Sequence, residues 1–106
     1  MAQDLKAGYV CILHVRGTSI YRFSYTTEDP EKKIPQVKAQ HPDLCFDDSS
    51  YVYFPDIEHA VIVIRESFGE FKCEIYREGG NFYVFKDNIN IQNIVNFLLL
   101  ASNPEL

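Results

Sequence analysis

The side chains best suited to metal binding and nucleophilic chemistry in this chain are its three histidines and three cysteines. The histidines do not have the spacing of a zinc site, and the cysteines include no CxxC pair. The odd number of cysteines argues against a disulfide framework and indicates a reducing compartment. We therefore predict no metal, no cofactor and no cysteine nucleophile, and we interpret Cys11 as a small core hydrophobe. The six residues are His14, His41, His59, Cys11, Cys45 and Cys73.

Five basic side chains in the first part of the chain offer a candidate contact surface for phosphate groups. Residues 1–41 hold six Lys/Arg and four Asp/Glu, whereas the whole chain carries a net charge of −5. Nucleic-acid-binding domains usually have a clear basic surplus. An ordinary solvated surface, with acidic side chains in the same segment, is therefore an equally good interpretation. The five residues are Arg16, Arg22, Lys32, Lys33 and Lys38.

The glycines and the apolar runs argue against several other classes of protein. Gly79 and Gly80 have the setting of a hairpin turn, and no glycine-rich loop joins a strand to a helix, so nucleotide binding has no support. The first residues contain no apolar stretch typical of a signal peptide. The longest apolar run, Phe97–Ala101, is too short to span a bilayer. We expect one intracellular, soluble domain over residues 1–106, in the cytoplasm or the nucleus, with no membrane partner.

The elements that position these side chains are expected to surround one amphipathic helix, predicted over residues 56–68. Its apolar residues recur at i, i+3, i+4, i+7 and i+11, which places them in one stripe on a helix. Asp56 has the place of an N-cap, and Gly69 has that of a stop signal. We expect this helix to pack in the centre of the core. The stripe consists of Ile57, Ala60, Val61, Ile64 and Phe68.

The strands are predicted from apolar runs and from alternation of apolar with polar residues. Residues 8–15 form a nearly continuous apolar run, which is typical of a strand buried on both faces. Residues 19–26 alternate and follow a turn at Gly17, which predicts a hairpin. The further strands are predicted over residues 51–54, 70–77 and 81–86, with a loop at 47–50 and a hairpin turn at 78–80.

A second helical segment lies between the first hairpin and the short strand. Residues 29–41 have helical character, but Pro35 would remove a backbone hydrogen bond inside a helix. We therefore expect a turn over residues 29–33, followed by a kinked or restarted helix that ends before Pro42. The inward residues are expected to be Ile34, Val37 and Ala39.

The last helix, predicted over residues 87–102, carries more apolar surface than one buried face needs. This surplus indicates that either the body of the protein wraps around this helix or a partner, which could be another protein or a second copy of the chain, covers part of it. The predicted fold is α+β, a small and mostly antiparallel sheet flanked by helices in the order β-β-α-β-α-β-β-α. The predicted inner face is Ile91, Ile94, Val95, Leu98 and Ala101, and the candidate interface residues are Ile91, Phe97, Leu99 and Leu100.

Four phrases of the sequence, taken in order, resemble the GIY-YIG nuclease domain, in particular its short viral and phage branch. They are GYVCIL, IYRFSYTTEDPEKK, EHAVIVIRESFGEF and GGNFYVF, and they span the chain from Gly8 to about Leu100. The resemblance implies a GIY-YIG-like α+β fold and a large DNA virus or phage as the source. It also implies a family that cuts nucleic acid with one divalent metal, which is held by a helix glutamate and assisted by tyrosines and an arginine.

The residues at the matching positions differ from those of the family. The tyrosines of the first two motifs fall on Cys11 and Arg22, and the glycine of the second motif falls on Ser24. The helix arginine becomes Lys33, which keeps the charge but lacks the bidentate fork for phosphate. The metal-binding glutamate becomes Val61, whose alkyl group cannot coordinate a divalent cation.

A scaffold of this kind without its metal ligand is predicted to be a non-enzymatic interaction or structural module. One alternative is a domain that binds nucleic acid through the five basic residues without cutting it. A further alternative is an endonuclease with a relocated site that uses Mg²⁺ or Mn²⁺ together with Tyr9, Tyr21, Lys33 and Glu58. Sheet packing otherwise explains the tyrosines, and the positive end of a helix otherwise explains Glu58.

Overall fold

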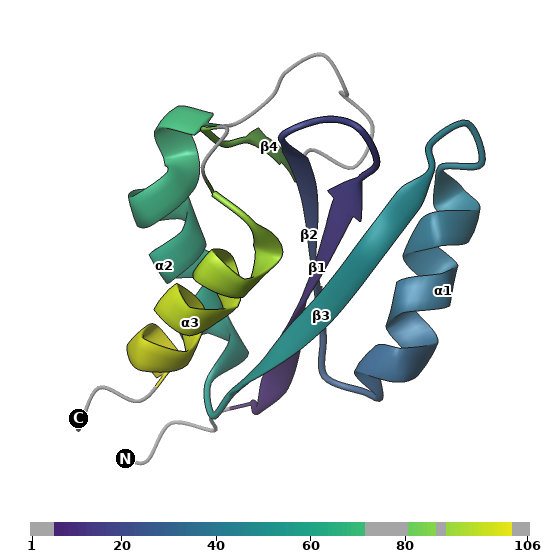
Figure 1. Ribbon diagram of the computed structural model, residues 1–106. Helices are drawn as coiled ribbons and strands as arrows, with labels where there is room; N and C mark the ends of the chain where they lie inside the picture. The colour runs from purple at the N-terminus through teal and green to yellow at the C-terminus, as the bar shows by residue number, and fades with distance from the viewer. Residues whose placement is uncertain (1–5, 72–80, 87–88, 103–106) are drawn as a thin grey trace, which may run out of the picture.

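Four antiparallel strands form one sheet, and helices cover both of its faces, in the computed structural model of the chain (Figure 1). The structure describes residues 6–71, 81–86 and 89–102, and within these ranges the predicted α+β class is confirmed. The strands are β1 (Gly8–Val15), β2 (Ile20–Thr26), β3 (Phe46–Phe54) and β4 (Phe82–Val84), in the spatial order β3-β1-β2-β4. The helices are α1 (Pro30–Gln40), α2 (Ile57–Phe68) and α3 (Ile91–Ser102), and a 3-10 turn, Gly69–Phe71, follows α2.

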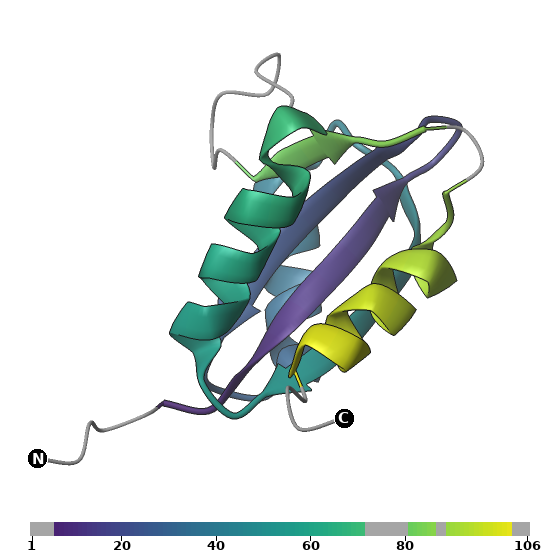
Figure 2. The ribbon, with the colours of Figure 1, turned by 90° about the vertical axis from the view of Figure 1, so that its left-hand side faces the viewer.

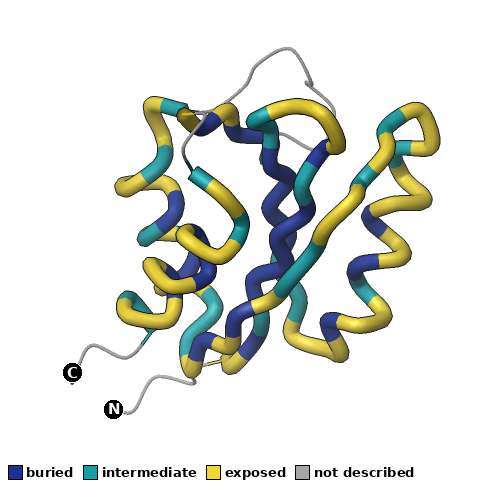
Figure 3. The backbone as a smooth tube through the Cα atoms, viewed as in Figure 1, coloured by how far each residue is buried: buried dark blue, intermediate teal, exposed yellow. Residues whose placement is uncertain are grey.

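Strand β1 lies in the interior of the sheet and is buried on both faces, as its apolar run predicted. Val10 and Ile12 belong to the core beneath α2 and α3, whereas Cys11 and Leu13 pack with apolar residues of α1. Figure 2 shows α2 and α3 across the near face of the sheet and α1 behind it. In Figure 3 the buried positions follow β1 and β2, and the outer sides of the helices are exposed. The predicted hairpin is also confirmed, with Gly17 in its turn at a φ of 75°.

Helix α1 runs without interruption through Pro35, so the predicted turn over residues 29–33 and a restart after it are wrong, whereas the predicted end before Pro42 is confirmed. Asp29 caps the helix, because its carboxylate accepts a hydrogen bond of 2.9 Å from the backbone N–H of Glu31. Pro35 is exposed, so water can hydrate the carbonyl group that loses its partner there. Ile34 and Val37 are buried as predicted, whereas Ala39 is exposed.

Strand β3 is longer than predicted, because residues 47–50 belong to the strand instead of a loop. It pairs with β1 from Gly8 opposite Phe54 to His14 opposite Asp48, with an irregularity after His14. Alternate residues of β1 turn their peptide groups toward β3, and hydrogen bonding to these groups outweighs the low strand propensity of Asp and Ser. The polar residues are tolerated because β3 is an edge strand.

Helix α2 spans the predicted residues, with Asp56 accepting a hydrogen bond of 3.1 Å from the N–H of Glu58. Ala60 and Ile64 are buried in the core. The predicted strand over residues 70–77 begins in the 3-10 turn Gly69–Phe71, and the rest of it lies outside the described residues, as does the predicted turn at 78–80. The strand predicted over residues 81–86 is shorter, and pairs with β2 as β4.

Helix α3 begins at Ile91, later than predicted, because the side chains of Asn90 and Asn93 cap it reciprocally. Each side-chain oxygen accepts a 2.9 Å hydrogen bond from the backbone N–H of the other residue. The predicted inner face is largely confirmed, with Ile94, Val95 and Leu98 buried. Among the described residues, no helix is long and apolar enough to cross a membrane.

Candidate interaction site

The positions that the resemblance would place in a nuclease site lie on two sides of the sheet. Cys11 is fully buried on the side covered by α1, and Arg22 lies on the same side, opposite Leu13 in the strand register. Val61 lies on α2, which packs on the other face. Burial raises the pKa of the Cys11 thiol to about 11, and the positive charge of Lys33 only partly opposes this. The Cys11 thiol is therefore protonated and inert at neutral pH.

The four candidate residues of a relocated nuclease site are not brought together. Tyr9 packs edge-on against Tyr51 on the α1 side, with ring centres 5.7 Å apart. Tyr21 faces the other side, where its hydroxyl donates a 3.2 Å hydrogen bond to the carbonyl oxygen of Ile89 and where burial raises its pKa. Glu58 is exposed in the first turn of α2, while Lys33 lies on α1 across the sheet.

The predicted phosphate-contacting set loses one member, because Arg22 is only 5% exposed. Strand β2 is an inner strand, and the Arg22 guanidinium lies 5.5 Å from the centre of the Phe82 ring and donates a hydrogen bond to the carbonyl oxygen of Phe23. Burial lowers its pKa. Arg22 therefore cannot contact a phosphate, and its assignment was wrong. Arg16, Lys32 and Lys38 are exposed, and Lys33 is half-buried.

One polar pair that the sequence did not reveal joins the first hairpin to β3. His14 Nδ1 lies 2.7 Å from an Asp47 carboxylate oxygen, and His14 Nε2 lies 2.6 Å from the carbonyl oxygen of Thr18. Each ring nitrogen therefore has an oxygen partner within hydrogen-bond distance. Asp47 was predicted in a loop, and only the pairing of β3 with β1 brings it to His14. Within residues 6–71, 81–86 and 89–102, no three His, Cys, Asp or Glu side chains are grouped as metal ligands.

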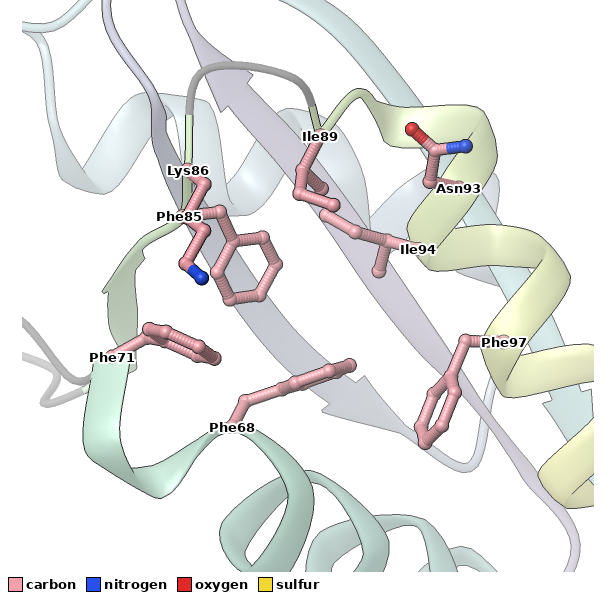
Figure 4. Close-up of a pocket in the computed structure, with 8 residues that line it drawn as sticks. All are labelled: Phe68, Phe71, Phe85, Lys86, Ile89, Asn93, Ile94 and Phe97. Carbon is pink, nitrogen blue, oxygen red and sulfur yellow. The ribbon is translucent and has the colours of Figure 1, made fainter.

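The aromatic groove is an apolar cavity of about 340 Å³ where the end of α2 faces the beginning of α3 (Figure 4). Phe68 joins the two helices, since its ring centre lies 5.0 Å from that of Phe85 and 5.2 Å from that of Phe97. Phe71 also contacts Phe85 edge-on, with ring centres 5.4 Å apart. The groove is lined by Phe68, Phe71, Phe85, Lys86, Ile89, Asn93, Ile94 and Phe97.

The chemistry of the aromatic groove is that of binding. Among its described lining residues, Lys86 and Asn93 are the polar ones, and none of these residues is a carboxylate, histidine or thiol that could transfer a proton or attack a substrate. Phe97, one of the predicted interface residues, forms part of its wall and is 41% exposed. Leu99 and Leu100 are exposed elsewhere on α3, whereas Ile91 is partly buried against the core.

No protein-family model, curated protein or solved structure matches this chain. The resemblance to GIY-YIG nucleases therefore stays a prediction.

Proposed function

We propose that this domain is a non-enzymatic protein-binding module and that the aromatic groove receives an apolar segment of a partner protein. The observation that carries the proposal is the composition of the groove, which combines four phenylalanine and two isoleucine side chains with two polar ones. Apolar cavities of this size bind ligands by burying their surface, and a few polar groups then set the orientation. Lys86 and Asn93 have that second role.

The most suitable segment is an amphipathic helix of the partner. The groove lies between the ends of two helices, and such grooves accept helices that present apolar residues at i, i+3 or i+4, and i+7. Phenylalanine-lined pockets make good anchor sites because large apolar side chains lose most of their water-exposed surface there. An acidic residue beside the anchors would pair with Lys86.

The experiment is a selection from a displayed library of helical peptides, followed by measurement of their affinities for variants of the domain. We expect the selected peptides to carry large apolar residues at helical spacing. Phe97→Asp should weaken their binding by at least about tenfold, because it places a charge in an apolar wall. Leu100→Asp is the matched control, since Leu100 is 68% exposed and lies outside the groove. Peptides that bind the Phe97 variant as tightly as the original domain would refute the proposal.

The two alternatives have weaker support. The residues of a relocated nuclease site lie on opposite sides of the sheet, and the basic set has lost Arg22 to the interior. Nicking of a plasmid with Mg²⁺ or Mn²⁺ that disappears in Glu58→Ala would support the nuclease. Binding of DNA or RNA that weakens steeply with salt would support the other alternative.

A further inference from the structure

The outer edge of β3 is open. Strand β3 comes first in the order β3-β1-β2-β4, and within the described residues it pairs with β1 alone. Figure 1 looks onto this edge, with β3 drawn in front of β1 and β2. The strand is nine residues long, and an exposed edge of that length is a template for another strand.

The peptide groups that point outward can be deduced from one hydrogen bond. The N–H of Phe23 donates to the carbonyl oxygen of Asn81, at 2.9 Å, so the peptide groups of Phe23 point away from β1. In an antiparallel ladder this direction alternates, and Ile12, opposite Phe23, must turn its peptide groups to β3. Ser50, opposite Ile12, therefore bonds inward. Its neighbours Ser49 and Tyr51 present their N–H and C=O groups to the open edge.

We propose that β3 pairs antiparallel with β3 of a second copy of this chain, so that the described strands of both copies form one continuous sheet. Full overlap of the strands Phe46–Phe54 places Ser50 opposite Ser50 on the two-fold axis. In this register Asp47 and Asp48 of each copy face the far end of the other strand instead of the other acidic pair. The two copies of Asp47 and of Asp48 are then separated along the strand by six and four residues, or ~20 and ~13 Å, so like charges do not oppose each other across the pair.

Exposed apolar and aromatic residues flank the open edge on both faces of the sheet. On the α1 side, Tyr51 and Tyr53 are 41% and 50% exposed. On the other side, Phe97 of α3 faces α2 through its contact with Phe68. Leu99 follows two residues later, about 200° around the helix, and so lies on the β3 side with an exposure of 50%. Pairing of two copies would bury the side chains of Tyr51, Tyr53 and Leu99, as at stable homodimer interfaces, and would leave Phe97 in the aromatic groove.

The first test is disulfide cross-linking of two variants that each carry one introduced cysteine besides the fully buried Cys11. Ser50→Cys and Ser49→Cys are made in a Cys45→Ser, Cys73→Ser background and oxidised at low protein concentration. On the two-fold axis the Cα atoms of residue 50 would be about 4.5 Å apart, which suits a disulfide. We expect Ser50→Cys to form a covalent dimer readily and Ser49→Cys, which faces Tyr51 of the other copy, to remain mostly monomeric.

The second test is the mass in solution by light scattering, where the dimer has twice the 12.3 kDa of one chain. Tyr51→Pro removes an N–H that points to the open edge, so it should leave the β1 ladder intact and weaken the dimer by at least about tenfold. Phe97→Asp should leave the dimer unchanged, because the proposed dimer forms through the edge of β3 and Phe97 lines the aromatic groove. A monomer at high concentration, cross-linking through residue 49 instead of residue 50, or a dimer that Tyr51→Pro does not affect would each overturn the proposal.

Discussion

Gly8 stands where the first residue of β1 passes very close to β2. A Cβ atom at this position would lie 2.6 Å from the carbonyl oxygen of Thr26 and 3.1 Å from two side-chain carbons of Ile57. The oxygen belongs to the backbone of the paired strand, so it can move away only if the ladder opens. Overpacking of this kind costs about 1–3 kcal/mol. Alanine recovers about 0.5–1 kcal/mol through its smaller loss of chain entropy.

Because the 2.6 Å contact is with a backbone atom, the overpacking cost should lie near the upper end of its range, at about 2–3 kcal/mol. Gly8→Ala should therefore lower the free energy of unfolding by about 1–2.5 kcal/mol, which corresponds to a fall of about 4–20 °C in the melting temperature of a domain of this size. Gly69→Ala is the matched control. Gly69 has helical angles, φ −57° and ψ −33°, and a Cβ atom there would have no neighbour within 4 Å. This second variant should be unchanged or up to about 1 kcal/mol more stable. Urea and thermal denaturation measure both, and a Gly8→Ala protein as stable as the original would show that the two strands do not approach in this way.

Three further predictions concern the packing of α3 and the buried titratable groups. Leu98→Ala, at a fully buried position, should cost about 2–5 kcal/mol of unfolding free energy, whereas Leu100→Ala should change it by less than about 0.5 kcal/mol in urea denaturation. In a Cys73→Ser background, a thiol reagent should modify the exposed Cys45 quickly and Cys11 only after unfolding; fast modification of both would contradict the packing of β1. Burial raises the pKa of Cys11 to about 11 and raises that of Tyr25 further, so the unfolded chain releases these protons first and stability should fall as the pH rises above about 9. Tyr25→Phe should reduce this fall, and a urea midpoint that does not change between pH 8 and pH 10.5 would contradict it.

The positions of most elements followed from patterns along the chain. Strand β1 and helix α2 were predicted within one residue of their observed bounds, because complete burial and one-sided burial each leave a distinct apolar pattern. The inner face of α3 was predicted for the same reason, and so was the surplus on its outer side. Such predictions need only the period of an element and no knowledge of its neighbours.

Three of the features that the sequence did not predict depend on a distant strand. Residues 47–50 have a composition typical of a loop, but they belong to β3 because β1 provides hydrogen-bond partners for the peptide groups of this strand. Arginine usually lies at the surface, but the strand that carries Arg22 lies between β1 and β4, and Arg22 is buried. The His14–Asp47 pair joins residues 33 positions apart, and no local signal marks it. A sequence pattern says which face of an element is apolar, but not which other element will cover it.

The aromatic groove and the open edge of β3 are separate surfaces because the exposed apolar residues of α3 point in different directions. Phe97 turns to α2 and the aromatic groove, while Leu99 turns to the open edge of β3. A groove-binding segment and a second copy of the chain would therefore not compete for the same side chains. A dimer with two free grooves binds a partner with two suitable segments far more tightly than one domain does, because the second contact forms within the complex. Such a domain would assemble other proteins through its two binding surfaces, and this role requires no catalytic residue.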